Sequence, residues 1–237
     1  MPIKTLFYME EKVPKDAQVS SKSNGKTPSA EKTEIIRHFT SVECLCLILK
    51  NGFRMSDAQN WEDKNDSYGI RRYAELQNGQ KVLVLCFCTT KGNVYHWKSL
   101  KSQKGLMCSI DIKKDEFFNY VRTLDGFREP KYVDYCNNDE IPKKDKENMP
   151  YLKRSEYRIE NEIRILYVGD RTDVLIPNIQ RFIASITIDS SNPELYKLAE
   201  DTLVNQYGIG KKQIKKNGFT DSQVWKRNVD TLIANSK

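Results

Sequence analysis

Alternating hydrophobic and polar positions give the most informative pattern in the chain, at 158–165. In an extended strand the isoleucines would fall on one side and the charged residues on the other: Ile159, Ile163 and Ile165 against Arg158, Glu160, Glu162 and Arg164. Two glutamates two positions apart, about 7 Å on one strand face, are an arrangement that sugar-transferring sites use. The alternative is an ordinary half-exposed strand in which Glu162 and Arg164 form a surface ion pair.

The remaining hydrophobic runs predict further strands and helices. Strands are predicted at 35–39, 53–56, 81–88, 105–112, 131–136 and 182–188. Helices are predicted at 42–50, 94–100, 115–123, 193–207 and 221–234, and a polar loop at 57–67. The continuous apolar run 81–88 is typical of a central strand that is covered on both faces. The mixture predicts the α+β class, with a mostly antiparallel central sheet and peripheral helices.

Two predicted helices carry apolar positions that should face the core. The helix at 193–207 places four residues near one stripe: Leu195, Leu198, Leu203 and Tyr207. The helix at 221–234 should bury a second set: Val224, Trp225, Val229, Leu232 and Ile233. Trp97 and Trp225 are interpreted as core anchors.

A change in composition near residue 34 marks the expected domain boundary. Residues 11–33 are rich in Lys, Ser, Asn and Pro and contain hardly any large apolar residue. Such a segment cannot bury enough apolar surface to fold by itself. We therefore expect a flexible N-terminal extension over 1–33 and a single α+β domain over 34–237.

The hydrophobic content predicts a cytoplasmic protein. No apolar run approaches the roughly 18 residues that a membrane-spanning helix needs. The first residues lack a basic segment and a small-residue cleavage site, so we expect no signal peptide. The six cysteines lie in apolar segments without zinc-ligand spacing, and Asp63, Asn65 and Asp66 lack the glycine and final glutamate of an EF-hand. These patterns favour free thiols, a turn at 63–66 and no bound metal.

A formal charge of +7 suggests contact with phosphate groups. Lysines and one arginine gather in several short clusters: Lys143, Lys144 and Lys146; Lys153 and Arg154; Lys211, Lys212, Lys215 and Lys216. Such a surface favours weak, salt-sensitive binding to nucleic acid and specifies no base sequence. The alternative is that these clusters are simply solvated faces.

Several spaced blocks, taken together and in order, resemble a known bacterial family. They lie at 36–41, 48–56, 61–66, 85–88 with Trp97, 105–111, 132–135 and 153–164. This order is similar to the family called domain of unknown function 2971, over about residues 34–220. The chain departs from that family at Tyr157, where a tryptophan is usual, and at a loosened turn over 65–67. The family name carries no activity.

A more remote similarity suggests a chemistry. A strand with His38, Phe39 and Thr40, followed by a helix that ends in Asn51 and Gly52, resembles the opening of DNA- and RNA-directed ADP-ribosyltransferases. The resemblance implies a split sheet, NAD as a substrate, and Thr89 on a strand that supports the nicotinamide. Cys88 replaces the usual first serine of that strand. The aromatic residue that would stack on nicotinamide is left open among Tyr68, Tyr73 and Tyr95.

The same resemblance implies a role for each candidate residue. Cleavage of the nicotinamide–ribose bond produces an oxocarbenium-like ribose, which a nearby carboxylate stabilises. Glu162 would take that role, and Glu160 would accept a proton from the incoming nucleophile. His38 would donate a hydrogen bond to the NAD ribose, and Arg37 or Arg164 would pair with the diphosphate.

Plain structural alternatives remain for two of the aromatic side chains. A histidine on a strand is often a satisfied structural residue, which is the alternative for His38. Trp61 lies in a polar segment, where its indole would either cover a cleft or pack back on the body of the protein.

The sequence thus leads to two functional hypotheses. The first is an NAD-dependent ADP-ribosyltransferase-like enzyme or NAD glycohydrolase that acts on a nucleic-acid or protein acceptor. As a toxin or phage-defence effector it would have an antitoxin or immunity partner. The second is a non-catalytic module that binds nucleic acid or protein. The sequence specifies neither the acceptor nor the oligomeric state.

Overall fold

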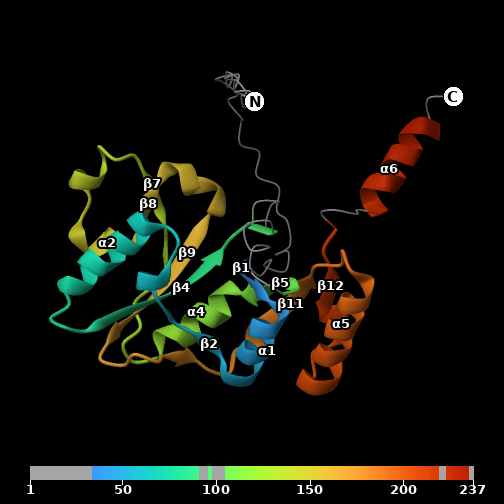
Figure 1. The fold of residues 1–237 in the computed structure, drawn as a ribbon, viewed down its shortest axis with the longest axis horizontal. Coiled ribbons are helices and arrows are strands. Elements are labelled where there is room, and N and C mark those ends of the chain that lie inside the picture. The colour runs from blue at the N-terminus through green and yellow to red at the C-terminus, as the bar shows by residue number, and fades with distance from the viewer. Residues whose placement is uncertain (1–33, 91–95, 98–104, 219–222, 235–237) are drawn as a thin grey trace, which may run out of the picture. The chain divides into compact units, whose positions relative to one another are not determined.

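The computed structural model describes residues 34–90, 96–97, 105–218 and 223–234 (Figure 1). The chain divides into two units, 1–32 and 33–237, and every element described below belongs to the second. The predicted extension at 1–33 and most of the predicted helix at 94–100 lie outside the described residues. These two expectations therefore stay predictions.

The described strands are short, apart from four that form the centre of the main sheet. They are β1 (Ile35–Ser41), β2 (Phe53–Arg54), β3 (Ser56–Asp57), β4 (Lys81–Cys88), β5 (Met107–Lys113), β6 (Lys131–Tyr132), β7 (Asp134–Cys136), β8 (Leu152–Arg154), β9 (Glu162–Gly169), β10 (Leu175–Ile176), β11 (Ile183–Ile188) and β12 (Ile214–Lys216). Within the described residues, eight strands form one sheet in the order β12-β11-β5-β1-β4-β9-β6, with β3 beside β4. Only β11 and β12 run parallel in this described sheet. The α+β class with a mostly antiparallel sheet is thereby confirmed.

Helices cover both faces of this sheet. They are α1 (Val42–Asn51), α2 (Lys64–Glu75), α4 (Lys114–Arg122) and α5 (Pro193–Tyr207); a further helix, α6 (Gln223–Ala234), contributes no side chain to either of the two described cores. Residues along β4 alternate between two cores: Leu83, Leu85 and Phe87 pack with α1 and α4, whereas Val82 and Val84 pack with α2. Strand β4 is therefore central and buried on both faces, as its apolar run predicts.

The main sheet consists of two continuous halves. Strand β1 pairs with β5 along its whole length, and β4 pairs with β9 along its whole length. Between the halves, the described residues of β1 and β4 pair at one position, Arg37 with Cys88. Beyond that pair the strands separate, and the His38 side chain reaches across to the carbonyl of Cys86 at 3.0 Å.

The polar segment 57–67 is not a loop, and this prediction is wrong. A 3-10 helix η1 (Ala58–Asn60) is followed by α2, which begins at Lys64. The Asp63 carboxylate caps α2 by accepting hydrogen bonds from the backbone N–H groups of Asn65 and Asp66. This cap directs Asp66, in the first turn of α2, toward the core, where it is buried.

The predicted strand at 158–161 is also wrong. Residues Ser155–Glu160 form a 3-10 helix, η5, and Asn161 takes a left-handed conformation with φ of 46°. Strand β9 therefore begins only at Glu162. Ile159, which the alternating pattern places in the core, is half exposed.

Helix α5 has the predicted bounds and α6 is described from Gln223, but neither helix buries all of the apolar residues expected to face the core. In α5 the predicted Leu203 is buried and the predicted Tyr207 is partly buried against the core, whereas Leu195 and Leu198 are exposed and Tyr196 and Ala199 are buried instead. In α6 the expected burial does not occur: the apolar side chains described there are exposed, with Trp225 at 70%. Val224 lies outside the described side chains. Trp97, the other predicted anchor, is buried.

Further 3-10 helices connect these elements: η3 (Ile141–Lys143), η4 (Lys146–Tyr151), η6 (Ile179–Phe182) and η7 (Lys211–Gln213). None of the described helices combines the length and the hydrophobicity that crossing a membrane requires.

Candidate functional site

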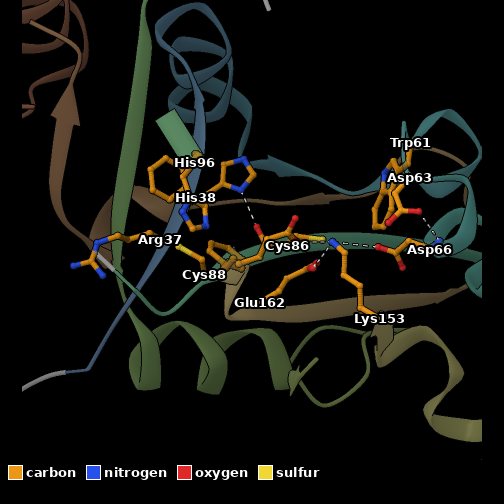
Figure 2. A pocket seen from close by; sticks show the side chains of 13 residues that line it. Arg37, His38, Trp61, Asp63, Asp66, Cys86, Cys88, His96, Lys153 and Glu162 are labelled. Atoms are coloured by element: carbon orange, nitrogen blue, oxygen red, sulfur yellow. Dashed lines mark hydrogen bonds and ion pairs between the residues drawn. The ribbon is translucent and has the colours of Figure 1, made fainter. Parts of the chain in front are cut away.

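A cavity of about 350 Å³ lies where β1 and β4 separate, and we call it the junction cavity (Figure 2). Its described walls come from β1, the end of β4, the start of β9, η5, β8 and the N-terminal part of α2. Segments far apart in the sequence therefore contribute side chains to one space. Among them are four of the six predicted site residues: Arg37, His38, Glu160 and Glu162.

Arg164 forms the base of this site. Its guanidinium is fully buried, donates from Nε to Glu162 Oε1 at 2.8 Å, and makes two parallel hydrogen bonds to Asp66 at 2.8 and 2.5 Å. Nη1 also donates to the carbonyl of Pro150. Because its donors are engaged and it is not among the described residues that line the cavity, Arg164 is not placed to bind a diphosphate, in contrast to the expectation. Its ion pair with Glu162 is buried, so the surface ion pair considered for these residues is not formed either.

Lys153 carries the second cation of the site, a role that no local sequence pattern predicts. Its ammonium nitrogen Nζ lies 2.5 Å from Glu160, 3.2 Å from Glu162 and 3.5 Å from Asp66 (Figure 2). Burial alone would lower the pKa of Lys153, but the carboxylates outweigh that effect and raise it. Lys153 is therefore charged at neutral pH. The sequence shows it only as part of a basic pair with Arg154.

The pKa values of the two glutamates of the site are shifted in opposite directions. Burial opposes the ionisation of Glu162, but the charges of Arg164 and Lys153 outweigh burial and lower its pKa to about 2. For Glu160, burial is the larger effect and raises the pKa, against the pull of Lys153. Glu162 is thus ionised at neutral pH, whereas Glu160 has a greater affinity for a proton. Two carboxyl groups whose environments separate their pKa values suit different steps of acid–base chemistry.

His38 is neutral and its hydrogen-bonding pattern is determined by Cys86. Burial lowers the pKa of His38, and the hydrogen bond to the Cys86 carbonyl offsets this only in part. Because a carbonyl only accepts, Nδ1 must carry the hydrogen, which leaves Nε2 as an acceptor. The expected role of His38 as a donor to ribose therefore reverses: it would accept a hydrogen bond from a ribose hydroxyl. The ring also packs against Phe53 and Phe87, so it supports the core as well.

The side chains of Arg37 and Thr89 bind other residues of the protein. The Arg37 side chain extends away from Lys153 and Glu162 (Figure 2), with Nε 2.9 Å from Asp111 and Nη1 donating to the carbonyl of Thr90. Thr89 donates through its backbone N–H and its hydroxyl to the carbonyl of Asn161. Thr89 thus fastens the end of β4 to the start of β9, next to Glu162, and is not among the described residues that line the cavity.

Aromatic side chains line the cavity, although not those considered from the sequence. Trp61 is half buried and lies under the Arg164 guanidinium at 5.5 Å, so it both packs back on the protein and lines the cavity. Phe39 stacks on His96 with ring centroids 5.0 Å apart, and both rings line the cavity. Tyr68 and Tyr73 are not among its described lining residues, and Tyr95 lies outside the described residues.

The described residues offer no group of three or more His, Cys, Asp or Glu side chains suited to a metal ion. All six cysteines are free thiols. The junction cavity is therefore a site of carboxylates, cations and aromatic rings.

No family model matches the chain, and no curated protein matches it at a significant level. The resemblances to domain of unknown function 2971 and to ADP-ribosyltransferases therefore rest on the motifs alone.

Proposed function

We propose that the chain is an NAD-dependent ADP-ribosyltransferase-like enzyme, and that the junction cavity holds the nicotinamide–ribose part of NAD. One observation carries this proposal. His38 from β1 meets Glu160, at the end of η5, and Glu162, at the start of β9, in a single cavity at the junction of the two sheet halves. A cavity of about 350 Å³ is at the lower end of the range usual for small-molecule sites.

The charge of the site favours a cationic ring. Four carboxylates line the cavity, from Asp63, Asp66, Glu160 and Glu162, whereas Lys153 and Arg164 supply two neutralising cations. Arg37 adds no free charge because it is paired with Asp111. The excess of negative charge, together with the aromatic rings in the walls, suits the flat, positively charged nicotinamide of oxidised NAD.

Each polar residue then has a defined task. The ionised Glu162 stabilises positive charge on the ribose as the carbon–nitrogen bond breaks and the electron pair leaves with nicotinamide. Glu160 accepts the proton of the attacking water or acceptor group, in line with its raised pKa. His38 accepts a hydrogen bond from a ribose hydroxyl through Nε2. Lys153 keeps Glu162 ionised and holds Glu160 beside it.

Consumption of NAD, or modification of an essential macromolecule, would harm a cell. The role that we propose is therefore a toxin or defence effector, and an antitoxin or immunity protein would be its partner. Both belong to the proposal and depend on the activity.

Nicotinamide release from NAD by the purified full-length chain tests the proposal. Wild type is compared with Glu162→Gln and Glu160→Gln, with and without single-stranded nucleic acid and protein acceptors. Glu156→Gln is the matched control, because Glu156 lies on the same 3-10 helix and is exposed. We expect release by wild type and by the control, and a loss of about 100-fold or more in both site variants.

Glu162 is buried in an ion network, so its variant is also compared with wild type in thermal unfolding. Glu160 is more accessible, with 19% of its side chain exposed, and its substitution separates chemistry from folding. Absence of nicotinamide release by wild type under every condition, or equal release by wild type and Glu160→Gln, would refute the proposal.

A further inference from the structure

A second cavity, of about 420 Å³, lies beside the junction cavity, and we call it the α2 cavity. The two cavities share Asp63, Asp66 and Lys153 as lining residues. Ion-paired Asp66 and Lys153 thus form a common wall. A group bound in the α2 cavity would lie next to the carboxylates of the junction cavity without occupying it.

Arg154 lines the α2 cavity and carries a buried donor that lacks an acceptor among the described residues. Nε of Arg154 is buried and has no hydrogen-bond partner among the described residues. The same guanidinium donates from Nη2 to the Tyr157 hydroxyl at 3.3 Å and lies over the Tyr157 ring. A buried charged N–H without an acceptor is costly, so such groups normally meet an anion or an ordered water. An oxygen acceptor close to Arg154 would therefore satisfy a donor that the described residues leave unpaired.

One stripe of α2 supplies the opposite wall. Asn65, Tyr68, Gly69 and Arg72 recur at helical spacing and line the cavity. Tyr68 is 58% exposed, and Arg72 adds a second guanidinium close to the solvent, where it is ion-paired with Glu75 of the same helix. Exposed flat rings next to guanidinium groups are the surfaces on which unpaired bases stack while their phosphates are held.

Basic residues continue from the cavity across its neighbouring loops. The 3-10 helix η3 supplies Ile141 to the lining, and η4 supplies Met149. The same two short helices carry the exposed Lys143 and Lys146. Together with the net charge of +7, these lysines offer a path for a polyanionic backbone beyond the cavity.

We propose that the α2 cavity binds one nucleotide unit of a single-stranded nucleic acid. Tyr68 stacks on the base, and Arg154 and Arg72 hold the adjacent phosphate. That the α2 cavity is the acceptor site of the transferase rests on the proposed function. That it binds single-stranded nucleic acid does not depend on the enzymatic activity.

Fluorescence anisotropy with labelled single-stranded RNA and DNA 12-mers of mixed sequence, in the absence of NAD, tests the inference on the full-length chain. Tyr68→Ala should weaken binding about tenfold through lost stacking. Arg154→Gln should weaken it and lower the slope of log affinity against log salt by about 0.7, the loss of one phosphate contact. Tyr132→Ala and Arg71→Gln are the controls, since both residues are exposed and neither is a described lining residue of the cavity. Both controls should bind like wild type.

Three outcomes would overturn the inference. The first is no binding of either oligonucleotide, and the second is an equal loss of binding in the site variants and their controls. The third is that polyglutamate displaces the labelled oligonucleotide as well as unlabelled oligonucleotide does. The last result would assign the cavity to acidic peptides. Because NAD is absent, the result is independent of the nicotinamide-release assay. Nucleic-acid binding without NAD cleavage would refute the proposed enzymatic function and support the nucleic-acid site. NAD cleavage without nucleic-acid binding would support the enzymatic function and refute the site.

Discussion

Arg164 makes two parallel hydrogen bonds to Asp66, and this pair joins strand β9 to helix α2 inside the protein. The two residues are 98 positions apart in the sequence. Their pairing brings α2 over the sheet, and with it Trp61 and Asp63 beside the junction cavity. The cavity therefore depends on a buried ion pair.

Removal of Arg164 should destabilise the protein strongly. Arg164→Met leaves Glu162 and Asp66 buried without their main counter-charge, and we expect a loss of about 3–5 kcal/mol in the free energy of unfolding. Urea denaturation measures it. Arg158→Met removes an exposed arginine from the adjacent 3-10 helix and serves as the control. A similar, small effect of both substitutions would show that the buried pair contributes little.

Acid should destabilise the protein through Glu162. Its pKa is about 2 in the folded protein, against an ordinary value of 4.5. A lowered pKa means that the stabilisation is complete above about pH 4.5 and is lost as the pH falls toward 2, in total roughly 3 kcal/mol. Urea unfolding at a series of pH values, for wild type and Glu162→Gln, isolates this contribution. An equal pH dependence of the two proteins would contradict the low pKa.

His38 should remain neutral at pH 7, with its hydrogen on Nδ1. Burial lowers its pKa below 6.5, and the Cys86 carbonyl requires a donor at Nδ1. The chain has two histidines, so nitrogen-15 NMR of the imidazoles, with His96→Gln for assignment, resolves both. A charged ring at neutral pH, or a hydrogen on Nε2, would remove His38 as an acceptor for ribose.

Gly52 should resist substitution more than Gly79. Both have positive φ, 99° and 86°, so alanine is strained by about 1–2 kcal/mol at either position. At Gly52 the added methyl group would also collide with the carbonyl of Ile176, whereas nothing lies near it at Gly79. We therefore expect a clearly larger loss of stability in Gly52→Ala than in Gly79→Ala, measured by thermal unfolding. Equal losses would mean that the backbone around Ile176 can give way.

Much of the fold is visible in the sequence because its central strands are continuous apolar runs. Strands β4 and β11 and helices α1 and α4 lie within one or two residues of their predicted positions. Helix α2 was missed because most of its residues are polar, although Asp63 gives a visible cap signal. Its position follows from the buried pair between Asp66 and Arg164, which local patterns do not reveal.

The candidate site was predictable only in part for a similar reason. Glu160 and Glu162 do converge, but through a left-handed Asn161 between a 3-10 helix and a strand, and not as neighbours on one strand face. Lys153 could not be found, because its role arises from the tertiary position of β8 beside these carboxylates. For α6, amphipathicity predicted a buried face that the structure does not show.

The pairing of β1 with β4 at a single described position, Arg37 with Cys88, has a consequence for the dynamics of the protein. Each half of the main sheet has its own complete hydrogen-bond ladder, so the amides of β4 and β9 should exchange with solvent as one cooperative group and those of β1 and β5 as another. A ligand in the junction cavity would contact both groups at once. Its binding should therefore slow exchange in the two halves together and make them open as a single unit.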